Sequence, residues 1–598
     1  MMKLYGKSNI RGDSVKIRSA FQHESYKHVH KRLYAIESVK AYEEALFARQ
    51  SIQVSAAKND FAAFQILLES DAATSVTIGT EPYFSTRDVR ENIRIETCGL
   101  PFPVTLRHIG AVTDDDSLRK ADILLADATV EVAAHEICCI WAEADIGPEA
   151  GPGQHKGEVR LYHHRMFEPE ELVQTLPFTI QIYNVTLPKA EERTFHLDLW
   201  QHNSNIARKQ EVPLYGDAHF AILERYVKSL AALGQKAITV VVSEIPWSGQ
   251  RCFYDPQEPD DLFEYSMIQV RRDKSGAYHY DYSVMQRYID LCFQYGIRDE
   301  IEVFGVCNIW KCEDDEYQFA PEGYPEYIRV RYYDEATGTY RYISDAEGIY
   351  AYLSALEEYF AQRGYLDIVR IAADEPNDLE RYQKSLAAVQ KAAPRFQYKT
   401  AVNHREFIEE FRTTVSDFVP GLFCMARDYD LLRDMAKKGT HRVSWYVCCS
   451  PKVPNTYLCS HLLESRAIGY LTDYFGFAGF LRWSYTVWPD DPRADLRFRY
   501  PDWRCGDTGF VYPSRGGDVL LSLRYQALRR GILDYELLHM ARQKGGGALV
   551  EEIMDRIVRI SDFSVFDKLD KMEADEIVSL TAEDYDWAKE KLLAFLQE

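Results

Sequence analysis

Two adjacent carboxylic acids, Asp374 and Glu375, stand at the end of an apolar run and are followed by a proline. The run, residues 368–373, has the composition of a strand that is covered on both faces, as in a parallel sheet wrapped by helices. Pro376 would end the hydrogen-bond ladder there, because proline has no N–H to donate. In such folds, ligands bind at the carboxyl ends of the strands, where the following loops converge. We therefore interpret Asp374 and Glu375 as the acids of an active centre.

The acid pair by itself leaves an alternative open. Consecutive strand residues point to opposite faces, so one acid could serve the site while the other forms a surface salt bridge. Polar and aromatic residues at the ends of the other predicted strands favour one shared site. Acids move protons, amides bind hydroxyl groups, and aromatic faces pack against the apolar side of a sugar ring. The residues at these strand ends are Trp247, Asn308, Asn403, His404, Tyr446, Trp483, Tyr485 and Trp488.

The aromatic residues of this set also have a simpler interpretation. Trp483, Tyr485 and Trp488 could pack in the core or in a loop, although their place at the exit of the last predicted strand favours the site. Trp247 has the weaker claim to a place in the site.

The elements that must position these residues alternate between helix and strand. Residues 217–234 are typical of an amphipathic helix with an acidic start and a terminating glycine. Seven strands follow, and the stretch Met267 to Arg271 is an ambiguous eighth. This count predicts a (β/α)8 barrel of the TIM type, with an open doubly wound sheet as the alternative. The seven strands begin at Ala237, Ile301, Ile368, Tyr398, Asp417, Arg442 and Gly479.

The remaining parts of the chain lie on either side of this barrel. The N-terminal part holds many short alternating segments separated by turns, which is typical of a β-sandwich. The residues after Gly545-Gly-Gly are charged and helical, and we assign them no catalytic role. The predicted domains are therefore a β-sandwich over residues 1–205, a catalytic barrel over 206–546 and a helical C-terminal extension over 547–598.

Composition and motifs exclude several classes of partner and cofactor. The net charge of −22 over 598 residues argues against nucleic acid or an anionic membrane as the main partner. Residues 1–14 contain no apolar core, and no uncharged apolar run is long enough to span a membrane, so we expect a cytoplasmic protein. There is no HExxH, P-loop or dinucleotide motif, and we predict no strand around His28-Val-His30. We expect no metal and no cofactor, a small-molecule or oligosaccharide substrate, and make no prediction of the oligomeric state.

Five motifs occur in order along residues 195–545: Leu214-Tyr-Gly-Asp-Ala-His-Phe, Asp374-Glu-Pro, Arg482-Trp-Ser-Tyr-Thr-Val-Trp with Asp491-Pro, Gly506-Asp-Thr-Gly-Phe-Val-Tyr-Pro, and Ser522-Leu-Arg-Tyr-Gln-Ala-Leu-Arg-Arg-Gly-Ile-Leu-Asp-Tyr-Glu. Together they resemble glycoside hydrolase family 123 and its relatives. The resemblance implies a β-sandwich followed by a (β/α)8 barrel. It also implies an exo-acting β-N-acetylgalactosaminidase that works by a substrate-assisted, retaining mechanism.

The resemblance assigns the acid pair of the family to Asp374 and Glu375. Glu375 would protonate the leaving oxygen and later activate water, which requires a pKa raised by a partly apolar pocket and a charged neighbour. Asp374 would hold the 2-acetamido N–H, so that the acetamido oxygen attacks the anomeric carbon and no enzyme nucleophile is needed. From their positions we expect sugar contacts from Trp483, Tyr446, Asn403 and Asp507.

Two other functions stay open on the sequence. The first is a retaining glycosidase with a separate carboxylate nucleophile, which would stand about 5 to 5.5 Å from the Glu375 carboxyl group. The second is a carbohydrate-binding relative that has lost its activity.

Overall fold

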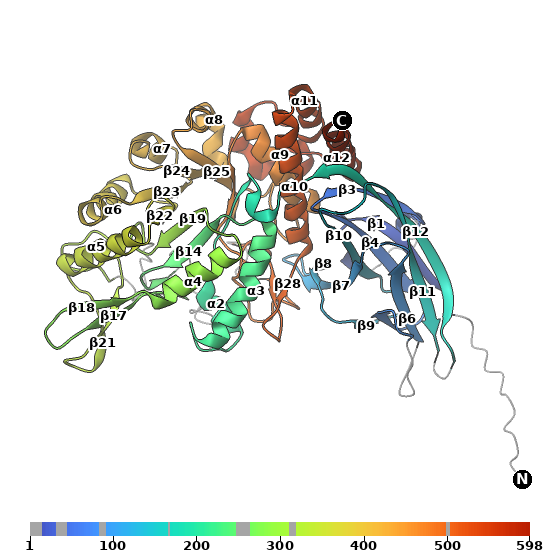
Figure 1. Ribbon diagram of the computed structural model, residues 1–598, viewed down its shortest axis with the longest axis horizontal. Coiled ribbons are helices and arrows are strands. Elements are labelled where there is room, and N and C mark those ends of the chain that lie inside the picture. The colour runs from blue at the N-terminus through green and yellow to red at the C-terminus, as the bar shows by residue number, and fades with distance from the viewer. Residues whose placement is uncertain are drawn as a thin grey trace, which may run out of the picture. The chain divides into compact units, whose positions relative to one another are not determined.

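The computed structural model describes residues 15–30, 45–82, 91–165, 168–246, 263–309, 319–497 and 503–598. The last two residues aside, the chain forms two compact units. One holds residues 1–110 and 124–186, and the other holds 111–123 and 187–596. Figure 1 shows strands in the first unit and strands alternating with helices in the second.

The N-terminal region is rich in β-structure, as predicted. Two six-stranded sheets share one apolar core, because alternate residues of most of their strands, such as Phe64 and Ile66 on one sheet and Val159 and Ile180 on the other, point into it. One sheet has the order β1 (Ile17–His23), β4 (Asp60–Ser70), β10 (Cys138–Ile146), β7 (Val104–Thr113), β8 (Arg119–Leu124) and β2 (Val29–His30). The other has the order β3 (Ile52–Lys58), β12 (Glu171–Thr186), β11 (Gly153–His164), β6 (Glu91–Cys98), β5 (Thr74–Ile78) and β9 (Thr129–Val132).

Eight parallel strands of the second unit form a nearly closed barrel. Each strand pairs with its neighbours in chain order, so the sheet has no point of reversal, unlike an open doubly wound sheet. The first and last strands of the sheet approach through a bridge between Leu197 and Gln235, and the Lys236 N–H donates to the Leu197 carbonyl at 2.9 Å. The strands are β13 (His196–Leu199), β14 (Ala237–Val241), β19 (Glu300–Phe304), β22 (Val369–Asp374), β23 (Gln397–Val402), β24 (Asp417–Pro420), β25 (Arg442–Tyr446) and β26 (Gly479–Arg482).

Seven of these strands lie where the sequence predicts them, and the eighth does not. The ambiguous stretch Met267 to Arg271 is not a barrel strand, because β17 (Gln269–Arg272) pairs instead in a small sheet. The small sheet has the order β18 (Tyr278–Asp281), β17, β20 (Arg331–Asp334) and β21 (Thr339–Tyr342). The barrel begins with β13, ahead of the predicted boundary at residue 206, and the larger part of its compact unit begins at Leu187.

A helix follows each barrel strand, and Figure 1 shows these helices around the sheet. In chain order they are α3 (Asp217–Leu233), α4 (Ser283–Gln294), α5 (Ala346–Gln362), α6 (Leu379–Ala392), α7 (Glu406–Phe411), α8 (Leu422–Lys437), α9 (Leu462–Phe475) and α10 (Leu523–Gln543). Helix α3 ends at Gly234, whose φ of 95° suits a glycine. The serine side chain at position 522 caps α10 by accepting the Tyr525 N–H at 2.9 Å.

The smaller elements complete the second unit. They are the 3-10 turn η1 (Ala190–Glu192), α2 (Asn203–Lys209), β15 (Ile245–Pro246), β16 (Phe263–Glu264), β27 (Tyr512–Pro513) and β28 (Val519–Leu520). The C-terminal residues are helical, as expected, and form α11 (Gly547–Ile557), η4 (Phe563–Lys571), η5 (Ala574–Glu576) and α12 (Ala582–Gln597). Within the described ranges, no helix combines the length and the apolar composition needed to cross a bilayer.

Candidate active site

The acid pair lies at the carboxyl end of β22, where the backbone leaves the extended conformation. Asp374 is the last residue of the strand, and Glu375 follows with a φ of 42°. This left-handed conformation is uncommon for a residue with a side chain. The Glu375 N–H still donates to the Ala401 carbonyl of β23 at 2.9 Å. The turn at Glu375 interrupts the strand alternation, so the two acids are not forced onto opposite faces.

Two neighbouring strand ends hold the Glu375 carboxyl group. The Tyr446 hydroxyl, at the end of β25, donates to Oε1, and the Asn403 side-chain amide, just after β23, donates to Oε2 at 3.1 Å. The Tyr446 ring lies against the backbone of Gly421, where an added Cβ would stand 3.1 Å from the ring. The small residue at 421 therefore helps to make room for the tyrosine that orients Glu375.

The surroundings of Glu375 favour its protonated form. Burial raises the pKa of the Glu375 carboxyl, and the nearby Asp507 raises it further. The hydrogen bond from Tyr446 and the charge of His404 oppose this rise without cancelling it. A carboxyl that keeps its proton to a higher pH than usual is suited to act as a general acid.

Asp507 is a second buried carboxyl group at this edge of the barrel. Its Oδ1 accepts from the Arg482 guanidinium at 3.0 Å and from the Trp483 indole N–H at 3.2 Å. Its Oδ2 has no hydrogen-bond partner among the described residues. Arg482 is not among the residues that the sequence predicts for the site, although an arginine at the end of the apolar strand Gly479–Arg482 is itself a sign of a buried anion.

The structure brings most of the predicted polar residues together. The Asn308 side-chain amide donates to the main-chain oxygen of Asp374, so β19 also contributes to the site. Trp483 is 5% exposed, and its ring lies 5.5 Å from that of Trp503. Trp247 lies outside the described residues.

The predicted set of sugar contacts has to be corrected at Tyr485 and Trp488. Both side chains are fully buried. The Tyr485 hydroxyl is 2.7 Å from the Ser229 hydroxyl of α3, and the Trp488 indole donates to the Val511 carbonyl at 2.6 Å. Their polar atoms are already bonded within the protein, so the structure places them in the core between the barrel and α3.

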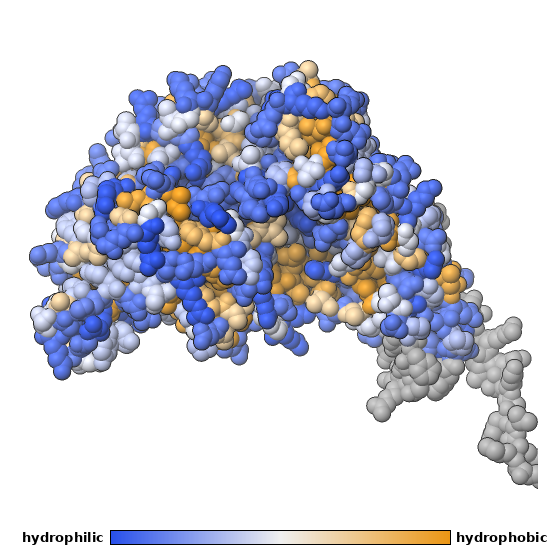
Figure 2. All heavy atoms as spheres, in the orientation of Figure 1, coloured by the Kyte–Doolittle hydropathy of each residue, from blue (hydrophilic) through white to orange (hydrophobic). Residues whose placement is uncertain are grey.

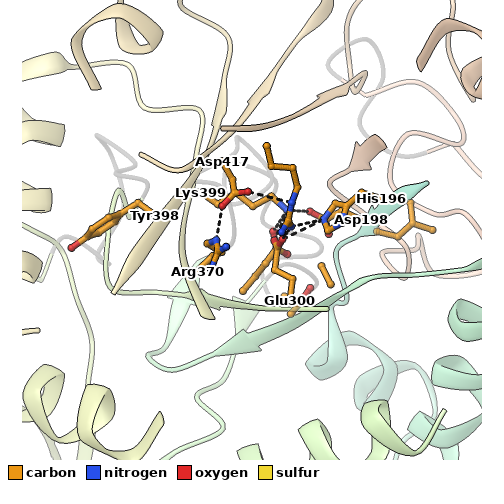
Figure 3. Close-up of polar contacts among 12 residues, drawn as sticks. His196, Asp198, Glu300, Arg370, Tyr398, Lys399 and Asp417 are labelled. Atoms are coloured by element: carbon orange, nitrogen blue, oxygen red, sulfur yellow. Dashed lines mark hydrogen bonds and ion pairs between the residues drawn. The ribbon is translucent and has the colours of Figure 1, made fainter. Parts of the chain in front are cut away.

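A cluster of charged side chains fills the barrel interior near the amino ends of the strands (Figure 3). Asp198, Glu300 and Glu302 have oxygens spaced like metal ligands. However, the Lys399 ammonium lies 2.5 Å from Asp198 and 2.7 Å from each glutamate, so a lysine stands where a cation would bind. A second such group is Asp114, Asp115 and Cys505, in which burial raises the pKa of the thiol and favours the form that binds no metal.

The fold places two adjacent acids, one with a raised pKa, at the carboxyl end of a barrel strand, which is the edge where barrel enzymes bind their substrates. A family model described as "Glycoside hydrolase 123, catalytic domain" matches residues 200–541. This is more than half of the 598 residues, and the chain belongs to glycoside hydrolase family 123. The protein is thus a glycoside hydrolase.

Comparison with solved structures agrees with this fold. A family 123 glycoside hydrolase from Clostridium perfringens, studied for glycolipid glycan hydrolysis, has a TM-score of 0.71 at 17% sequence identity, with 97% of each chain covered. At this identity the likeness shows the fold alone. A β-D-glucuronidase from Dictyoglomus thermophilum has a TM-score of only 0.27 at 11% identity, covering 79% of this chain and 66% of its own. No curated protein matches the chain.

Proposed function

We propose that this enzyme removes a terminal β-linked N-acetylhexosamine, namely N-acetylgalactosamine, by a substrate-assisted retaining mechanism. The observation that carries the proposal is the Glu375 carboxyl group. It has a raised pKa, is held by Tyr446 and Asn403, and directly follows Asp374 at the carboxyl end of β22. We also propose that the nearly closed barrel is a TIM-type (β/α)8 barrel and that the two N-terminal sheets form a β-sandwich.

In this mechanism the two acids have separate tasks. Glu375 gives its proton to the glycosidic oxygen as the bond to the anomeric carbon breaks. Asp374 holds the 2-acetamido N–H, while the acetamido oxygen forms a bond to the anomeric carbon and yields an oxazolinium ion. The Glu375 carboxylate then takes a proton from water, and that water opens the ring and restores the acetamido group. The anomeric configuration is retained because the carbon is attacked twice.

Free hydrogen-bond acceptors near Glu375 support a sugar substrate. Neither Asn403 Oδ1 nor Asp507 Oδ2 has a hydrogen-bond partner among the described residues, and both atoms are buried. A buried acceptor without a donor is costly, and sugar hydroxyls are donors. The clostridial relative is described as acting on glycolipid glycans, and we propose that the substrate of this enzyme is also the glycan of a larger conjugate.

A panel of aryl β-glycosides with and without a 2-acetamido group tests the mechanism. We expect the wild type to cleave only the acetamido substrates. Glu375→Gln should lower kcat by about 10²–10⁴-fold, because the proton donor is lost. Asp374→Asn should also lower kcat for the acetamido substrates. Tyr485→Phe serves as a control, since it removes a hydroxyl in the core. Equal cleavage of a galactoside and an N-acetylgalactosaminide would contradict the proposal.

Asp507 supports one alternative, a retaining glycosidase with its own nucleophile. Its charge reaches Glu375, and one of its oxygens has no hydrogen-bond partner among the described residues. Under this alternative the wild type also cleaves the galactoside, and Asp507→Asn abolishes cleavage of both substrates. Added azide then restores cleavage by the variant, and the product is a glycosyl azide. Loss of activity in Asp507→Asn for acetamido substrates without azide rescue would instead fit a residue that binds the sugar.

A further inference from the structure

A groove of about 710 Å³ lies along the small sheet β18-β17-β20-β21. Its lining includes Leu214–Gly216 from the loop after β13, Glu244 from the loop after β14, and Arg331, Tyr333 and Tyr340 from the segment between β19 and α5. These loops all leave the carboxyl ends of barrel strands. Asp374 ends β22, which pairs directly with β19. The groove therefore lies on the same edge of the barrel as the acid pair.

Five of the residues that line this groove are tyrosines. The strand register places His279, Arg271, Tyr333 and Tyr340 in one row across the four strands, on one face of the sheet. Tyr340 is 67% exposed, Tyr333 is 39% exposed and Tyr265 is 36% exposed. These three are among the six exposed large hydrophobic side chains of the described residues. The rings of Tyr333 and Tyr340 lie 5.3 Å apart, so an open aromatic surface faces the groove.

Each basic side chain that lines the groove lies beside a carboxyl group. Arg331 lies 2.7 Å from Glu244, Arg271 lies 2.6 Å from Glu335, and His279 lies 2.7 Å from Asp273. The two arginines are therefore balanced by acids and do not favour an anionic ligand. Figure 2 shows mostly blue and pale residues over the part of the surface formed by this sheet, without a broad hydrophobic area. Such a surface is unlike the apolar centre of a protein–protein interface.

We propose that this groove binds the neutral hexose units that follow the scissile bond in the glycan. Tyrosine offers an apolar ring face for a sugar and a hydroxyl for its polar groups. The volume is within the range of pockets that hold an extended small ligand. The proposal rests on the proposed function, since it assigns the groove to the part of the same substrate that is released from Glu375.

Two substrates of different length test this role. One is an aryl β-N-acetylgalactosaminide, and the other is a tetrasaccharide with a terminal β-N-acetylgalactosamine on three neutral hexoses. For the double variant Tyr333→Ala/Tyr340→Ala we expect kcat/KM for the tetrasaccharide to fall about tenfold, because aromatic anchors carry much of the binding energy at such sites. The value for the aryl glycoside should stay within twofold of the wild type.

Two controls separate lost stacking from lost folding. Tyr333→Phe/Tyr340→Phe keeps the rings and should retain most of the activity toward the tetrasaccharide. Leu172→Ala truncates another exposed apolar side chain, which is 54% exposed and lies in the N-terminal region. It should not change kcat/KM for either substrate. An equal loss for both substrates in the double alanine variant would overturn the proposal, and so would no loss for either. If a second copy of the chain occupied the groove instead, the double alanine variant would change the sedimentation of the protein and leave both activities unchanged. That result would also overturn the proposal.

A binding measurement distinguishes failure of this inference from failure of the proposed function. The probe is the neutral trisaccharide without the N-acetylgalactosamine, titrated into the intact Glu375→Gln protein and followed by calorimetry. We expect binding that the Tyr333→Ala/Tyr340→Ala substitutions weaken about tenfold. This result would support the groove even if the enzyme showed no preference for acetamido substrates. No binding of the trisaccharide to the Glu375→Gln protein would overturn the inference while leaving the catalytic proposal intact.

Discussion

At the scale of single residues, the central question is how Glu375 keeps its proton. Burial and the charge of Asp507 raise its pKa, while Tyr446 and His404 act in the opposite direction. The Tyr446 hydroxyl therefore has two effects. It orients the carboxyl group, and it stabilises the carboxylate form that the proposed mechanism needs in its second step, where Glu375 acts as a base.

Tyr446→Phe should shift the pH dependence of the enzyme. The substitution removes the donor to Oε1, so the pKa of Glu375 rises. Since the acid is active only while protonated, the alkaline limb of the kcat/KM profile should move to higher pH, and kcat should fall because the carboxylate is less well held. Tyr485→Phe is the control, because its hydroxyl bonds Ser229 in the core. A shift of the alkaline limb to lower pH would contradict this assignment.

Residue types and strand ends predicted the acid pair and its partners Asn403 and Tyr446. They did not predict the left-handed backbone at Glu375, because φ at a strand end depends on what the neighbouring strands allow. Residue types and strand ends also did not predict that Tyr485 and Trp488 lie in the core. An aromatic residue at a strand exit can face the mouth or the helix layer, and the sequence carries no sign of which occurs.

At the scale of elements, the barrel interior is unusual because charged side chains fill the part near the amino ends of the strands. Parallel barrels usually fill this space with branched apolar side chains. Here three cations, Lys399, Arg370 and Arg442, meet four carboxyl groups, Asp198, Glu300, Glu302 and Asp417. One proton on a carboxyl group would balance the charges. Burial and the nearby Asp198 raise the pKa of Glu302, whereas Lys399, His196 and Arg442 lower that of Glu300 despite its burial.

Glu302→Gln should therefore be tolerated far better than Glu300→Gln. A glutamine resembles a protonated Glu302, so we expect a change below about 1 kcal/mol near pH 5. Glu300→Gln removes a buried charge from Lys399 and Arg442, which should cost about 3–5 kcal/mol. Urea denaturation of both variants measures the difference. Equal losses of stability would show that Glu302 is charged in the folded protein.

The pH dependence gives this prediction a definite sign. The folded pKa of Glu302 is raised, so above the unfolded pKa the folded state binds more protons than the unfolded state. Stability from this group is then present at low pH and is lost as the pH rises toward the folded pKa, by up to about 1.4 kcal/mol per pH unit. Glu302→Gln lacks this slope, so its stability relative to the wild type should increase with pH.

This interior also explains why the first barrel strand escaped prediction. In β13 (His196–Leu199) the residues that face the cluster are His196 and Asp198, so the four-residue strand lacks the continuous apolar run expected of a buried parallel strand. The seven longer or more apolar strands were recognisable. The polar partners that make an aspartate tolerable inside a barrel are distant in sequence, and only the fold brings them together.

At the scale of the whole molecule, residues 111–123 belong to the same compact unit as the barrel, although the sequence places them within the N-terminal β-region. Asp122 is fully buried and accepts from the Arg524 guanidinium at 2.9 Å and from the Tyr512 hydroxyl at 2.5 Å. The barrel unit therefore depends on a segment that residues 124–186 separate from the rest of the unit in the chain.

Asp122→Asn should destabilise the barrel unit. The substitution leaves the Arg524 guanidinium buried without its acid, which should cost about 3–5 kcal/mol. Asp116→Asn is a matched control in the same segment, because Asp116 is 48% exposed and its pair with Lys120 should contribute below about 1 kcal/mol. Urea denaturation followed by tryptophan fluorescence measures both. Similar midpoints for the two variants would show that residues 111–123 do not stabilise the barrel.

The sequence by itself determined the order of parts, the seven clear strands, the acid pair at the end of β22 and the resemblance to family 123. These features follow from local composition and spacing, which a single chain displays directly. Only the tertiary structure decided the first strand, the backbone turn at Glu375, the core positions of Tyr485 and Trp488, and the place of residues 111–123 in the barrel unit. Each of these depends on contacts between residues far apart in the chain, whose energies decide which face a side chain takes and which charges can be buried.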